Sequence, residues 1–170
     1  METKTVKLYA LSYKETRAYM VAALLIVGNI VLPQICHLIP QGGLTWLPIY
    51  FFTLIGAYKY GWRVGLMTAL LSPTVNSLLF GMPIVAMLPA IISKSVLLAL
   101  AASWVARRFN SVSLLLLLGV VLTYQVAGSL VEWAMKGSFF AAMQDFRIGL
   151  PGMAFQIVGG FLVLRYLLKK

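Results

Sequence analysis

The sequence is poor in acidic residues. Only four of its 170 residues are Asp or Glu, against 14 Lys and Arg, and the formal net charge is +10. The four acids are scattered along the chain: Glu2, Glu15, Glu132 and Asp145. None forms the kind of acidic pair that holds magnesium for phosphoryl or prenyl transfer, so that chemistry is excluded.

Cysteine and histidine are scarcer still, with one of each, Cys36 and His37. A single cysteine excludes an intramolecular disulfide. A metal site is not expected, because zinc and calcium need several such ligands together. The sequence also lacks HExxH, GxSxG and P-loop motifs. We therefore expect no enzyme and no cofactor, and any ATP-driven work must fall to another subunit.

Hydrophobic residues are abundant, at 61% of the chain, and the mean hydropathy is +0.92. Soluble domains average roughly 45–50% apolar residues. Eleven cations fall in alternate gaps between apolar segments: Lys4, Lys7, Lys14, Arg17, Lys59, Arg63, Arg107, Arg108, Arg165, Lys169 and Lys170. Because basic loops stay cytoplasmic, this alternation predicts a multi-pass protein of the bacterial cytoplasmic membrane with both termini inside. The cations lie at helix ends beside anionic lipid, and a nucleic-acid partner is not expected.

The apolar segments predict one all-α membrane domain. A cytoplasmic lead-in at 1–17 precedes six spans near residues 18–38, 46–60, 64–80, 84–105, 112–135 and 151–168. The second and third are short for the roughly 20 residues that a crossing needs. Pro33 is expected to kink or end the first helix. Residues 39–45 and 136–150 are expected to be outer loops.

Polar residues inside these spans usually face the interior of a bundle. Gln125, Ser129 and Glu132 share one face of the fifth span by their spacing. Thr68, Ser72 and Asn76 share one face of the third, and either join helices or line a pocket. Gln156 lies just below the outer start of the last span. Most of these groups are expected to line one cavity that opens to the outside.

Lys94 lies near the middle of the membrane, where an unpaired ammonium costs at least about 2.5–3.5 kcal/mol. It therefore needs an anion. Glu132 is the expected internal partner, and a substrate carboxylate or phosphate is the expected external one. A structural Lys94–Glu132 pair, or a lysine that extends along its helix to the interface, is the alternative.

The first span opens with Ala18 and Ala22, a small-x-x-x-small pair that lets another helix approach closely. With the six spans, a long first loop that leads into Leu47-Pro-Ile, and the stretch from Phe52 to Gly65, the chain resembles the S component of energy-coupling factor transporters. This resemblance implies a subunit that binds a vitamin or related micronutrient from outside. It also implies a transmembrane T component and two cytoplasmic ATPases as partners, with Ala18 and Ala22 as the docking face.

The resemblance places substrate contacts in the outer half of the last three spans. By location, it assigns them to Lys94, Gln125, Glu132 and Gln156, to which we add Asn76 and the aromatic Trp133. The ammonium of Lys94 favours a substrate with an anionic group. We hypothesise that the substrate is a small carboxylated vitamin or cofactor precursor. Two other classes remain open. One is a self-sufficient secondary transporter or channel, for which an inverted repeat would be expected. The other is a structural membrane protein without a small ligand.

Overall fold

The computed structural model describes residues 11–168, and over this range it contains helices and no strand. The all-α class is therefore confirmed. The elements are α1 (Thr16–His37), α2 (Gly42–Trp46), η1 (Pro48–Tyr50), α3 (Phe51–Tyr60), α4 (Trp62–Phe80), η2 (Val85–Met87), α5 (Leu88–Phe109), α6 (Leu114–Lys136), α7 (Phe139–Ala142), α8 (Gln144–Ile148) and α9 (Leu150–Leu168). Most of the predicted lead-in, together with Lys169 and Lys170, lies outside the described residues.

Four helical segments in the described part of the chain are long and apolar enough to cross a membrane: α1, η2 with α5, α6, and α9. Local signals set their ends. Ser113 caps α6, because its Oγ accepts a hydrogen bond of 3.2 Å from the Leu116 N–H. Gly137 ends the same helix with a φ of 66°, in the left-handed region that glycine tolerates.

The predicted second span is interrupted. The helix is interrupted at Leu47, which lies between the short α2 and the η1 turn. The φ and ψ of Leu47 are 45° and 46°, in the left-handed region. The helix that follows, α3, has only ten residues, or about 15 Å at 1.5 Å per residue. Pro33 does not end α1, which continues to His37, and the expected outer loops contain α2, α7 and α8.

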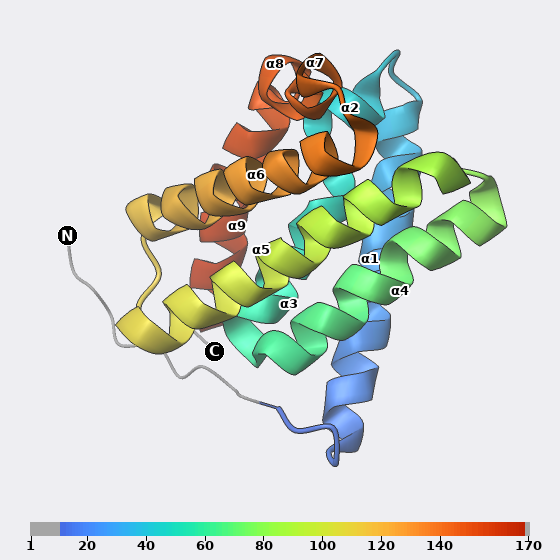
Figure 1. Cartoon of the computed structure of the whole chain (residues 1–170). Helices are drawn as coiled ribbons and strands as arrows, with labels where there is room; N and C mark the ends of the chain where they lie inside the picture. The colour runs from blue at the N-terminus through green and yellow to red at the C-terminus, as the bar shows by residue number, and fades with distance from the viewer. Residues whose placement is uncertain (1–10, 169–170) are drawn as a thin grey trace.

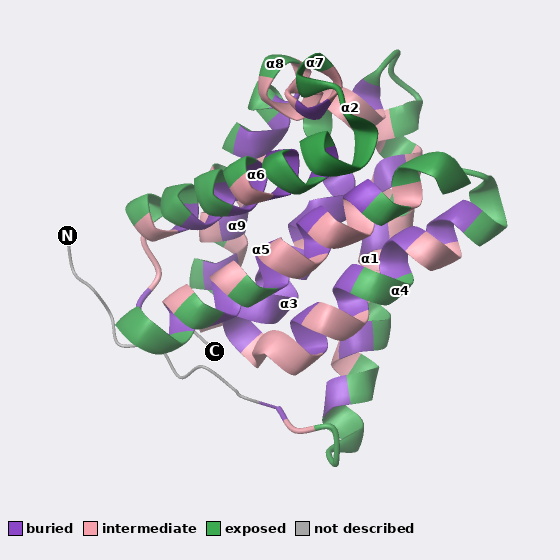
Figure 2. Ribbon diagram, viewed as in Figure 1, coloured by how far each residue is buried: buried purple, intermediate pink, exposed green. Residues whose placement is uncertain are grey.

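The short α3 lies inside the bundle, where it packs against α1, α4, α5 and α9 (Figure 1). Every residue from Thr53 to Lys59 is buried, whereas exposed residues mark the outer face of α6 (Figure 2). Small residues allow the close packing. A Cβ on Gly65 would come within 2.5 Å of the Ala57 Cβ, so α3 and α4 approach more closely than larger residues would permit.

Polar side chains join α3 to its neighbours. Asn29 of α1 donates to Thr53 Oγ1 at 3.0 Å and to Ser72 Oγ at 3.2 Å, and its Oδ1 accepts the Phe52 N–H at 3.1 Å. All three contacts are buried or partly buried and link α1, α3 and α4. Of the two interpretations of the third-span stripe, helix joining is the one that these contacts favour for Ser72.

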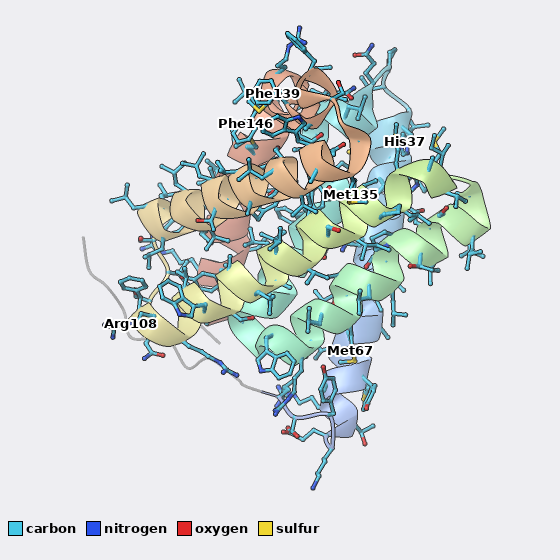
Figure 3. The ribbon with its side chains drawn as sticks, in the orientation of Figure 1. His37, Met67, Arg108, Met135, Phe139 and Phe146 are labelled. Atoms are coloured by element: carbon cyan, nitrogen blue, oxygen red, sulfur yellow. The ribbon has the colours of Figure 1, made fainter. Side chains whose placement is uncertain are left out.

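Hydrogen bonds tie together the chain segments at one end of the bundle. The Leu11 N–H donates to the Tyr60 carbonyl at 3.2 Å, and the Tyr58 hydroxyl donates to the Ser111 carbonyl at 2.7 Å. Lys59 Nζ donates to the Leu167 carbonyl near the end of α9. These bonds bring the basic connecting segments between the long helices to the same end of the molecule. Figure 3 shows Arg108 at this end and His37 at the opposite one.

Ala18 and Ala22 correct the sequence interpretation. They were expected to form an outward docking face, but their exposed fractions are 0% and 3%. Both methyl groups belong to the core cluster of the bundle, on the helix that packs against α3 and α4. The small-x-x-x-small spacing does mark a close helix contact, but the contact lies inside this chain.

Ala18→Leu is therefore expected to lower the stability of the protein by about 1–3 kcal/mol, because the extra carbons have no space. Ala23→Leu is the matched control, since Ala23 is exposed on the same helix. Thermal unfolding in detergent measures both. Equal melting temperatures for the two variants would show that Ala18 does not pack inside the bundle.

Candidate functional site

A buried lysine lies near the end of the bundle opposite the basic end. Lys94 is on α5, and its residue exposure is 2%. Gly128 of α6 makes room for it, because a Cβ there would overlap Lys94 Cγ. The aliphatic stem of Lys94 thus passes between α5 and α6, and its ammonium extends toward the short helices α7 and α8.

Two carboxylates bind this ammonium. Lys94 Nζ lies 2.6 Å from Glu132 Oε2 on α6 and 2.6 Å from Asp145 Oδ2 on α8. The other oxygen of Glu132 lies 2.6 Å from Lys136 Nζ, one helical turn further along α6. The four side chains form a row of alternating charge, Asp145–Lys94–Glu132–Lys136, which we call the charge row. Its formal charges sum to zero.

The charge row lines a small cavity of about 90 Å³. Other walls come from the loop before α3 and from the start of α5, and they include Gly43, Leu47, Tyr50, Ala90 and Ile91. The cavity has room for several water molecules, since one needs only about 10–15 Å³ of such space. Sites for small organic ligands have volumes of about 300–1,000 Å³. The cavity as it stands therefore accommodates part of a ligand only.

A larger cavity of about 350 Å³ lies between α6 and the α7–α8 segment. Its walls are apolar apart from Ser129: Val126, Leu130, Trp133, Phe139, Ala142, Met143 and Phe146. Figure 3 shows Phe139 and Phe146 together at the end where α7 and α8 lie. Adjacent residues of α8 face different cavities, since Asp145 lines the small one and Phe146 the large one.

Several buried polar side-chain atoms lack hydrogen-bond partners. Among the described residues, both amide atoms of Gln125 and the hydroxyls of Ser95 and Ser129 make no hydrogen bond. Each such atom costs about 1–3 kcal/mol when it is left unpaired. Gln125 and Ser129 lie one turn apart on α6, and Ser129 reaches the large cavity. These unpaired groups are the kind that a polar solute or water would satisfy.

The structure separates the predicted site residues. Lys94 and Glu132 meet in the small cavity, and Trp133 lines the large one. Gln156 is committed elsewhere, because its amide oxygen accepts from the Tyr124 hydroxyl at 2.9 Å and its nitrogen donates to the Leu47 carbonyl. Asn76 lies between α4 and α1, where it accepts from Gln34 Nε2 at 3.0 Å. The predicted single cavity therefore does not include Gln156 or Asn76.

Sequence reasoning named Glu132 as the internal partner of Lys94, and the structure confirms this pair. It missed Asp145, Lys136 and Tyr50. One signal for Asp145 was present, since it is one of only two acids outside the N-terminal lead-in. No protein-family model, curated protein or solved structure matches the chain. The resemblance to S components therefore remains an expectation from the sequence.

Lys94→Met is expected to destabilise the protein by up to about 3–5 kcal/mol, the range for breaking a buried ion pair. A double variant, Lys94→Met with Glu132→Met, should recover much of the loss because it removes both buried charges. Lys136→Met is the control, as its side chain is 34% exposed. Thermal unfolding in detergent compares the three. Similar losses for Lys94→Met and Lys136→Met would contradict the burial of the ion pair.

Gly128→Ala is expected to lower the melting temperature, because the new methyl group displaces the stem of Lys94 from between α5 and α6. Gly119→Ala on the same helix is the matched control. A Cβ at Gly119 meets no atom within 4 Å, and alanine favours the helix over glycine by about 1 kcal/mol. The control should therefore be neutral or stabilising, and a neutral Gly128→Ala would show that Lys94 does not pass beside Gly128.

Proposed function

We propose that the chain is the substrate-binding membrane subunit of an uptake system of the S-component type. Its solute is a vitamin or related micronutrient that carries an anionic group. The observation that carries the proposal is the charge row beside a cavity, at the end of the bundle opposite the basic end. A buried ion pair contributes little net stability, and paired charges beside a cavity provide groups that could bind a charged solute.

The proposed topology has six crossings, with both termini at the cytoplasmic face of a bacterial membrane. The gathering of basic gaps at one end supports this orientation, because cytoplasmic loops carry the excess of Lys and Arg. In this topology α3 does not reach across the hydrocarbon layer by itself. Its short length matters little, since α1, α4, α5 and α9 pack around it and η1 leads directly into it.

In this proposal the chain does no catalysis, and energy comes from a T component with two cytoplasmic ATPases. The absence of a P-loop in the sequence supports separate ATPases. The contact with the T component is not assigned to Ala18 and Ala22, because both are buried against this chain's own helices. Partner docking at that pair would require α1 to separate from α3 and α4.

One observation favours a second candidate, a structural membrane protein. Lys94 is fully paired within the chain, so its burial needs no external anion. The two candidates differ in what they require of the cavities. A binding subunit needs the cavity to open and accept a solute, whereas a structural protein needs the charge row to stay closed.

We expect the protein, purified in detergent and then denatured, to release a small molecule with a carboxylate that mass spectrometry identifies. The Lys94→Met/Glu132→Met variant is the control, and it should release none because both recognising charges are gone. Cells that also express T and ATPase subunits should accumulate the compound only with the wild-type chain. Release of nothing from the wild type, with no uptake, would favour the structural candidate.

A further inference from the structure

The charge row has a buried middle and more exposed ends. Side-chain exposure is 2% for Lys94 and 9% for Glu132, but 14% for Asp145 and 34% for Lys136. Asp145 is held by the five-residue α8, and Lys136 is the last residue of α6. The two end members can therefore move into water at lower cost than the two middle ones, whose stems lie inside the bundle.

We propose that the solute is a zwitterion. Its carboxylate takes the place of Asp145 on Lys94, and its amine takes the place of Lys136 on Glu132. This inference rests on the function proposed above and adds a cationic group to the anionic one. When no solute is bound, Asp145 pairs with Lys94 and Lys136 pairs with Glu132, so neither buried charge is left without a partner.

The charge balance of the row favours a zwitterion over a simple anion. Asp145 and Glu132 both lie 2.6 Å from the same ammonium, so an anion in place of Asp145 sits close to the Glu132 carboxylate. Like charges at such distances repel unless a second cation is present. Lys136 supplies that cation when the site is closed. An amine on the solute would supply it when the site is occupied and would keep the sum of charges at zero.

The geometry limits how far apart the two charges of the solute can be. They must touch Lys94 and Glu132, which are themselves in contact. An amino-acid head with its amine one to three carbons from the carboxylate meets this condition. The small cavity has room for such a head group and little more.

The rest of the solute has a place only if α8 moves. The carboxylate of Asp145 faces the small cavity and the ring of Phe146 faces the large one. Displacement of Asp145 therefore shifts the helix that separates the two cavities. Solute binding and movement of the α7–α8 segment are expected to occur together.

Thermal unfolding of the purified wild-type protein tests the charge requirement with named compounds. The panel contains the standard amino acids, β-alanine and γ-aminobutyrate, each beside the matched acid without the amine and the matched amine without the carboxylate. We expect at least one zwitterion to raise the melting temperature, and both of its single-charge analogues to have much weaker effects. An acid that stabilises the protein as well as its zwitterion does would overturn the inference.

Four variants then test which residues recognise the solute and which are displaced by it. Lys94→Met and Glu132→Gln should weaken binding of the stabilising zwitterion roughly 100-fold, as expected for loss of one partner of a buried charge pair. Asp145→Asn and Lys136→Gln should bind it more tightly than the wild type, because they remove internal competitors. Arg147→Gln, at an exposed position of α8, is the control and should bind unchanged. Weaker binding by Asp145→Asn and Lys136→Gln would overturn the displacement.

The compound released from the denatured protein separates this inference from the proposed function. An acid with a primary or secondary amine supports both. An acid without an amine leaves the uptake function standing and overturns the zwitterion. If no compound is released and no member of the panel stabilises the protein, both proposals fail.

Discussion

The burial of one ammonium group constrains the half of the bundle that lies opposite the basic end. Lys94 extends from α5 between two helices, and a charge at that depth is tolerated only with partners. Glu132 on α6 and Asp145 on α8 provide them, so one lysine joins three helices, α5, α6 and α8. The position of α8 then sets the walls of both cavities. The burial of Lys94 also requires glycine at position 128, because the side chain of any larger residue would overlap the aliphatic stem of the lysine.

The other half of the bundle is organised around a short buried helix. The ten residues of α3 are enclosed by neighbours that approach closely at small residues such as Ala18, Ala57 and Gly65. Most polar groups there are satisfied within the chain, as the three contacts of Asn29 show. Unpaired polar atoms occur in both parts of the described bundle: the amide group of Gln125 and the hydroxyl of Ser129 on α6, and the amide nitrogen of Asn76 on α4.

Much of the fold was predictable because long apolar runs and basic gaps depend on local composition alone. The sequence predicted every long helix, as well as the pair of Lys94 with Glu132, since few acids are available to a buried cation. Contacts between distant segments were harder. The spacing of Ala18 and Ala22 indicates a close helix contact but does not say which helix fills it. Asp145 lay in an apparent loop, and only the packing of α7 and α8 over the bundle brings it to Lys94.

The two ends of the molecule differ in how they are held, and this difference determines where it can open. At the basic end, backbone and side-chain hydrogen bonds connect the start of α1, the end of α3, the α5–α6 connection and the end of α9. At the other end, α7 and α8 are four and five residues long, and Asp145 holds them through one ion contact to Lys94. Around the large cavity α7 packs against α6, and α8 packs against α2 and α9. In the binding proposal, opening occurs where the charge row ends, because a solute that replaces Asp145 on Lys94 removes the ion contact between α8 and α5.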